Sequence, residues 1–148
     1  MITMKLAYDL HIHSALSPCA DDDMTPNNIV NMAILKGLDI IAVTDHNSTF
    51  NCGAVAGCAR GKDILVVPAM EMETREEVHL LCFFPHMRAA EQIGSLVYKS
   101  LPGIKNREDI FGRQVVMDEF DNEVRSEDTL LLTACAMDVE EAFYVVRK

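Results

Sequence analysis

The stretch Ala7-Tyr8-Asp9-Leu10-His11-Ile12-His13-Ser14 closes an apolar run with two histidines that are one residue apart. Side chains alternate between faces in an extended chain, so both imidazoles point to the same side. Imidazole is a common ligand of zinc and iron ions. We therefore predict a first strand over residues 5–11 whose carboxyl end carries a metal clamp made by His11 and His13.

Further helices and strands alternate along the first half of the chain. Thr25 and Pro26 are typical of a helix start, and Gly37 is typical of a helix end. Strands separated by helices imply parallel βαβ units, in which functional groups collect at the carboxyl ends of the strands. Beyond the first helix we expect strands at 39–44, 64–70 and 78–84 and a short helix at 51–60.

The second half shows a different pattern. His86 is expected to start a surface helix that continues over residues 89–99, and Asp138 is expected to cap a last helix over 139–147. Between them we expect a polar loop at 101–112 and a hairpin with arms at 114–118 and 123–125. No repeat or linker divides the chain, so residues 1–148 are expected to form a single α/β domain.

Charge and cysteine content limit the function classes. The net charge of −10 disfavours nucleic acids, without excluding them, and also disfavours anionic membranes. Residues 1–5 lack the basic and then apolar pattern of a secretory signal, and the five cysteines form no C-x-x-C pair. We expect a cytoplasmic protein with reduced thiols. Cys19 lies in the loop beside the histidine pair, where it could contact a metal.

Three more segments place polar groups on or after strands. Thr44-Asp45-His46-Asn47 follows the second strand, where a loop would open onto a site, although such residues are also common in plain turns. Glu71 follows the apolar third strand, and a carboxylate beside a core needs a partner that a metal would supply. His79 lies in the fourth strand, where its alternative role is that of a buried neutral histidine with a hydrogen bond.

The acidic run Asp21-Asp22-Asp23 lies between the histidine pair and the first helix. Three neighbouring carboxylates repel one another and usually form a solvated turn. One of them could instead bind a cation, or stabilise the start of the helix through its dipole.

In order along the chain, four motifs resemble the first half of the PHP (polymerase and histidinol phosphatase) family. They are Asp9-Leu10-His11-Ile12-His13-Ser14, Thr44-Asp45-His46-Asn47, Pro68-Ala69-Met70-Glu71 and Val78-His79-Leu80. The resemblance implies a distorted seven-stranded β/α barrel, similar to a TIM barrel, that binds up to three zinc, manganese or iron ions. It also implies hydrolysis of a small phosphorylated substrate by a metal-activated water.

The resemblance assigns roles to individual residues. It implies that Glu71 bridges two ions, one bound by the histidine pair and one that His79 helps to bind, and that His46 serves a third. Asp21 matches the carboxylate or histidine that members place after the H-x-H motif, and Asp9 and Asp45 would orient imidazoles. The implied metal ligands are His11, His13, Asp21, His46, Glu71 and His79.

One departure from the family sets a limit. The last histidine is His86, so the later family motifs, another histidine and a D-x-H, are absent from the final 62 residues. We therefore expect the first half of a barrel, from the amino-terminal part of a longer protein. Its metal loading would be partial, and it could self-associate through uncovered strand edges. Two other functions stay open: an amidohydrolase-type metal hydrolase, which also begins with H-x-H, and a non-catalytic PHP-like regulatory or assembly module.

Overall fold

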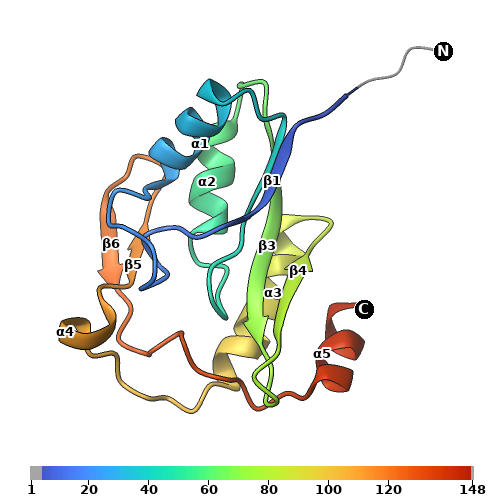
Figure 1. The fold of residues 1–148 in the computed structure, drawn as a ribbon, viewed down its shortest axis with the longest axis vertical. Helices are drawn as coiled ribbons and strands as arrows, with labels where there is room; N and C mark the ends of the chain where they lie inside the picture. Colours follow the sequence, from blue (N-terminus) through green and yellow to red (C-terminus); the bar gives the residue numbers. More distant parts are fainter. Residues whose placement is uncertain (1–4, 148) are drawn as a thin grey trace.

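The computed structural model describes residues 5–147, so residues 1–4, which enter the expectation about a secretory signal, lie outside it, as does Lys148. Its main sheet has four strands in the order β1-β2-β3-β4, and a separate two-stranded sheet is formed by β5 and β6 (Figure 1). The strands are β1 (Tyr8–Ile12), β2 (Ile40–Val43), β3 (Leu65–Glu73), β4 (His79–Phe83), β5 (Val115–Met117) and β6 (Glu123–Ser126). The helices are α1 (Pro26–Leu35), α2 (Cys52–Ala59), α3 (Met87–Lys99), α4 (Glu108–Phe111) and α5 (Val139–Val146).

The first three strands are parallel, as the alternation of strands and helices predicts. β1 pairs with β2, and β2 pairs with β3, each in parallel register. The connecting helix α1 is capped by Thr25, whose side chain accepts a hydrogen bond from the Asn28 N–H, and Gly37, with a φ of 70°, follows its end. The predicted βαβ units are therefore confirmed for β1, β2 and β3.

The fourth strand departs from the parallel pattern. β4 pairs with β3 in antiparallel register, with Glu73 opposite His79. Only residues 74–78 connect the two strands, and a parallel crossover needs about a dozen residues or more. The expectation of parallel βαβ units throughout is therefore wrong at this point. Because β4 is antiparallel to β3, its first residue lies next to the carboxyl end of β3.

Alternation along the strands separates a helix-covered face from a second face. Ile12 packs against a core formed by β2, α1 and α2. Met70 and Met72 belong to a second core with residues of β4, α3 and α5. The intervening residues of the same strands, among them His11 and Glu71, lie on the other face. This division places the candidate metal ligands opposite the helices.

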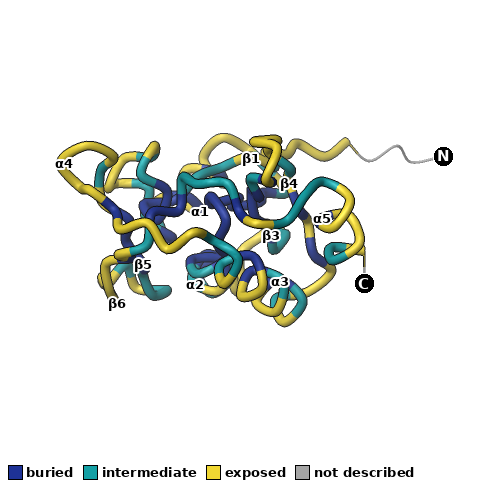
Figure 2. The backbone as a smooth tube through the Cα atoms, turned by 90° about the horizontal axis from the view of Figure 1, so that it is seen from below, coloured by how far each residue is buried: buried dark blue, intermediate teal, exposed yellow. Residues whose placement is uncertain are grey.

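The remaining elements lie on either side of this sheet. The predicted hairpin is confirmed as β5 and β6, and the capping box of Asp138 and Glu141 starts α5. In Figure 1 the hairpin and α4 lie at one side of the molecule and α5 at the other. The short helix α4 falls inside the predicted polar loop and has no buried residue, as Figure 2 shows.

Within residues 5–147, no helix has the length and apolar character needed to cross a bilayer.

Asn47 connects the strand ends to the carboxyl-terminal third of the chain. Its side chain is fully buried and donates to the Leu131 and Thr133 carbonyls, both at 2.9 Å. Its Oδ1 accepts from the Glu73 N–H at 2.9 Å. The backbone of Asn47 has a φ of 47°, a conformation that Asn tolerates better than most residues.

We expect Asn47→Ala to lower the free energy of unfolding by about 2–4 kcal/mol, because it leaves buried carbonyls and an N–H without partners. Asn47→Gly removes the same amide but suits the positive φ, so it should lose slightly less. Urea denaturation of both variants measures the difference. Wild-type stability in either variant would contradict a structural role for the amide.

Candidate metal centre

The centre is built around the carboxylate of Glu71, on the face of β3 opposite the helices. Glu71 is 6% exposed, and its backbone bridges to His46, which follows β2. Four imidazoles from three segments surround it: His11 within β1 and His13 just after it, His46 after β2, and His79 at the start of β4. The parallel strands bring His11, His13 and His46 to the end of the sheet where β1, β2 and β3 finish. The antiparallel β4 begins at that same end and brings His79.

The two oxygens of Glu71 face different imidazoles. Oε2 lies 3.3 Å from His11 Nε2, 3.2 Å from His13 Nε2 and 3.6 Å from His46 Nδ1. Oε1 lies 3.0 Å from His79 Nδ1. Within residues 5–147, each of these ion-pair partners of Glu71 is a histidine, so no fixed cationic side chain neutralises the carboxylate.

Burial sets the protonation of this cluster. Burial, assisted by the neighbouring His13, lowers the pKa of His46 to about 4, and burial also lowers the pKa of His13. For Glu71, burial acts to raise the pKa, but the four surrounding imidazoles together lower it below its ordinary value. At neutral pH the buried rings are therefore uncharged and the carboxylate is ionised, which are the forms that bind a metal.

The hydrogen bonds of Ser17 determine which nitrogen of His13 is bare. The Ser17 hydroxyl donates its proton to Asp45 Oδ1 at 2.7 Å, so Ser17 Oγ can only accept from His13 Nδ1, 3.2 Å away. Neutral His13 then carries its hydrogen on Nδ1. In that tautomer Nε2 is the bare nitrogen of His13, and it lies 3.2 Å from Glu71 Oε2. Both atoms are then available as ligands to a cation that lies between them.

His11 Nε2 and His79 Nδ1 lie within hydrogen-bond distance of Glu71, and the spacing of the ligand atoms around Oε2 also fits a shared ion. A tetrahedral zinc ion with ligand distances of about 2.0–2.2 Å separates neighbouring nitrogen and oxygen donors by about 3.4 Å. The contacts of Glu71 Oε2 span 3.2–3.6 Å, a range that includes this separation. In addition, His46 Nδ1 is buried without any hydrogen-bond partner. The residues present therefore fit a divalent cation.

Cys19, rather than Asp21, lies beside His46. The Cys19 sulfur is 3.5 Å from His46 Nε2, and the donor atoms of His13, Cys19 and His46 all lie within 4.8 Å of one another. Asp21 is exposed, and its carbonyl accepts from the Met24 N–H in the turn before α1. Within residues 5–147, no potential donor group of three includes Asp21.

The two aspartates expected to orient imidazoles have different positions. Asp9 accepts a hydrogen bond from the backbone N–H of His11 at 3.1 Å on an exposed part of β1. Asp45 is buried and accepts from the Ser14 N–H at 2.8 Å, the Ser14 hydroxyl at 2.6 Å and the Ser17 hydroxyl at 2.7 Å. Asp45 thus reaches His13 through Ser17.

Sequence reasoning missed Ser14 and Ser17 as supporting residues. The signal was available in principle, because a buried Asp45 needs donors, and the loop after the histidine pair contains two serines. Ser17 Oγ also accepts from the His46 N–H at 3.2 Å, so one hydroxyl contacts both loops of the centre.

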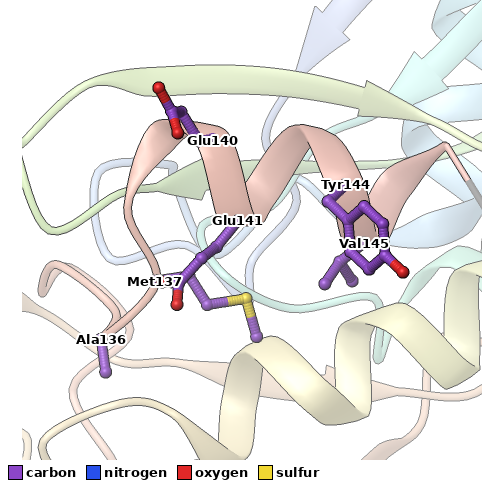
Figure 3. A pocket seen from close by; sticks show the side chains of 6 residues that line it. All are labelled: Ala136, Met137, Glu140, Glu141, Tyr144 and Val145. Carbon is purple, nitrogen blue, oxygen red and sulfur yellow. The ribbon is translucent and has the colours of Figure 1, made fainter.

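Other features named by the sequence lie away from the centre. His86 caps α3, as predicted, with Nδ1 accepting from the Ala89 N–H at 3.1 Å. A hollow of about 720 Å³ lies against α5 (Figure 3) and contains none of the donor residues. Its lining residues are Ala136, Met137, Glu140, Glu141, Tyr144 and Val145.

The chain is similar to part of a curated protein and to parts of two solved structures. An uncharacterized protein of Methanocaldococcus jannaschii is 31% identical over 91 residues, which are 62% of this chain and 11% of that protein. The crystal structure of a proposed metal-dependent phosphoesterase from Bifidobacterium adolescentis matches 64% of this chain and 33% of its own, with a TM-score of 0.51 and 23% identity. An amidohydrolase from Chromobacterium violaceum, solved with bound sulfate and no metal, matches 63% of this chain and 32% of its own, with a TM-score of 0.47 and 22% identity.

The chain therefore spans about a third of the length of these two solved structures and a smaller share of the archaeal protein. The match to the Bifidobacterium structure indicates a shared fold. A family model covers far more of the chain, from residue 9 to residue 139, and its description is the PHP domain. The chain belongs to the PHP domain family.

Proposed function

We propose that this PHP domain is a metal-dependent phosphoesterase, or the metal-binding portion of one. The observation that carries the proposal is the convergence of His11 Nε2, His13 Nε2 and His46 Nδ1 on Glu71 Oε2 within 3.2–3.6 Å. The name of the Bifidobacterium relative, a proposed metal-dependent phosphoesterase, supports the same reaction class.

The ligand atoms of the centre would be divided between a first and a second ion. His11, His13 and Glu71 Oε2 supply three donors in one compact group and are expected to hold the first ion. Glu71 Oε1 and His79 would contribute to a second, with Glu71 as the bridge. Zinc, manganese and iron are the candidate metals. Such ions, when bound, polarise a phosphate ester, lower the pKa of a bound water and offset the charge of the displacement.

The remaining polar residues of the centre position its donors. Asp45 fixes Ser14 and Ser17, and Ser17 fixes the ring of His13 and the backbone of His46. With the ring hydrogen of His13 donated to Ser17, its Nε2, 3.2 Å from Glu71 Oε2, is available to an ion. In this chain of net charge −10, neutral imidazoles and a carboxylate would bind a phosphate only with cations present.

We also propose that the four-stranded sheet is the first half of a seven-stranded barrel. Leu81 and Phe83 lie on the same face of the sheet as Glu71 and are 39% and 41% exposed. Within residues 5–147, β1 and β4 each have one strand neighbour. Further strands would cover both the face and the edges, and self-association through those edges would be the other way to cover them.

We also propose that the protein is located in a reducing compartment of the cell. The five cysteines are all free, and the one that is exposed, Cys19, lies beside a histidine. This usage is typical of the cytoplasm, where thiols stay reduced.

We expect the purified chain to retain zinc or manganese after dialysis, and Glu71→Gln to lower the affinity for the ion by more than about tenfold, because the first ion loses its only anionic ligand. Elemental analysis and chelator competition measure this. His86→Ala is the control: it removes a helix cap worth about 1 kcal/mol but should keep the ion. Equal metal content in Glu71→Gln and the wild type would contradict the proposed centre.

Ser17→Ala tests the positioning role. Loss of the hydroxyl frees the ring of His13 and should weaken ion binding by about 10–100-fold, the usual effect of removing a hydrogen-bond partner of a metal ligand. Ser100→Ala makes the same substitution in a hydroxyl that donates to the Val97 carbonyl at the end of α3. An affinity as low in Ser100→Ala as in Ser17→Ala would point to general destabilisation instead.

The reaction class is tested with a chromogenic phosphodiester, a phosphomonoester and an anilide, each with added manganese or zinc. We expect slow hydrolysis of a phosphate ester that is lost in His11→Ala. Cleavage of the anilide alone would favour amidohydrolase chemistry. Ion binding without any hydrolysis would favour a non-catalytic regulatory or assembly module.

A further inference from the structure

We propose that the Cys19 thiolate is a metal ligand, and that together with His46 it holds an additional ion at a nitrogen–sulfur site that prefers zinc to manganese. The proposal rests on the function proposed above, because it extends the same centre. It assigns to Cys19 the place that the sequence resemblance gives to Asp21.

The distance between the two donors fits a shared ion. A tetrahedral zinc ion with about 2.3 Å to sulfur and about 2.0 Å to nitrogen separates these two ligand atoms by about 3.5 Å. Cys19 Sγ lies 3.5 Å from His46 Nε2. One ligand atom from each of His13, Cys19 and His46 lies within 4.8 Å of the other two. Because His13 Nε2 is assigned above to the first ion, the additional ion is held by Cys19 and His46.

A second observation is the burial of the His46 ring and its position between Glu71 and Cys19. The residue is 6% exposed, and its Nδ1 is buried without a hydrogen-bond partner. Its ring lies between Glu71 on the Nδ1 side and Cys19 on the Nε2 side, and it stacks on His13 with 4.6 Å between ring centroids. Because a neutral imidazole has one bare nitrogen, an ion bound at Nε2 beside Cys19 leaves the ring hydrogen on Nδ1, on the side of Glu71.

The loop that carries Cys19 is held in place. The Ala20 N–H donates to the Ser17 carbonyl at 2.9 Å, which closes a turn over Pro18 and Cys19, and Ser17 is bonded to the buried Asp45. On the outer side, a Cβ at Gly112 would lie 3.1 Å from the Pro18 carbonyl, so the neighbouring chain packs closely on this turn. These contacts fix the loop, so the Cys19 sulfur is held beside His46, and the residue is also exposed to solvent.

The other cysteines have ordinary packing roles. Cys52, Cys58, Cys82 and Cys135 are buried, and each thiol points to a backbone carbonyl. Cys19 is exposed and lies against an imidazole. Thiolate is a soft ligand that suits zinc, whereas manganese prefers carboxylate and water oxygens. Binding would convert the thiol to a thiolate and release one proton to solvent for each ion bound.

Cobalt(II) reports this ligand directly, because thiolate ligation gives a charge-transfer absorption in the near ultraviolet and nitrogen or oxygen ligation does not. The full chain, stripped of metal and kept reduced, is titrated with cobalt and then with zinc. We expect the charge-transfer band to appear, to be displaced by zinc, and to be absent in Cys19→Ser. In Cys19→Asp the visible cobalt bands should remain without the charge-transfer band, with a shift of preference towards manganese.

Cys58→Ser is the matched control, because a serine hydroxyl can still donate to the Glu119 carbonyl that the Cys58 thiol contacts. It should keep the band in full. Visible cobalt bands without a charge-transfer band in the wild type, or a band that survives Cys19→Ser, would overturn this inference and leave the Glu71 centre standing. Absence of any cobalt or zinc binding would overturn both.

Discussion

The centre depends on one buried carboxylate, that of Glu71, which four imidazoles contact. Glu71 Oε2 lies 3.2 Å from His13 Nε2, and Ser17 holds the hydrogen of that ring on the far nitrogen. The oxygens of Glu71 also lie within hydrogen-bond distance of His11 Nε2 and His79 Nδ1. Although burial acts to raise the pKa of Glu71, the imidazoles together hold that pKa below its ordinary value. The ionised carboxylate and the neutral imidazoles are the forms that bind a metal, so the same arrangement that stabilises Glu71 provides the ligands of an ion.

The ligand atoms of the centre are held in place because the surrounding loops are fixed by buried polar side chains. Asp45 binds the loop after β1, Asn47 binds the segment at residues 131–133, and Asn51 binds the β5–β6 hairpin through Val115 and Met117. Each of these side chains has partners for its oxygen atoms, and the two amide groups also have partners for their hydrogens. Fully satisfied buried networks of this kind restrict a structure to one arrangement. The centre is therefore more rigid than a set of loops of the same length would suggest.

The sequence predicts the parts of this architecture that local chemistry controls. Alternation and caps predict β1, α1, the β5–β6 hairpin and α5, and the position of polar residues at strand ends predicts that His11, His13, His46, Glu71 and His79 come together. It does not predict the direction of β4, because the apolar pattern of 78–84 is the same for a parallel and an antiparallel strand. It also does not separate Cys19 from Asp21, since both lie in the loop before α1. The turn over Pro18 decides which of them reaches His46.

The reversal of β4 has a chemical consequence. A parallel fourth strand would start at the opposite edge of the sheet, whereas the short turn after β3 places His79 next to Glu73 and 3.0 Å from Glu71 Oε1. The two oxygens of the Glu71 carboxylate then face separate groups of imidazole ligands. A carboxylate that bridges two ions needs this arrangement. With Cys19 on the far side of His46, the centre offers donors of graded softness, from carboxylate through imidazole to thiolate. Because affinity follows ligand type, ions that enter such a centre are not equivalent, and the softest metal is expected at the sulfur end.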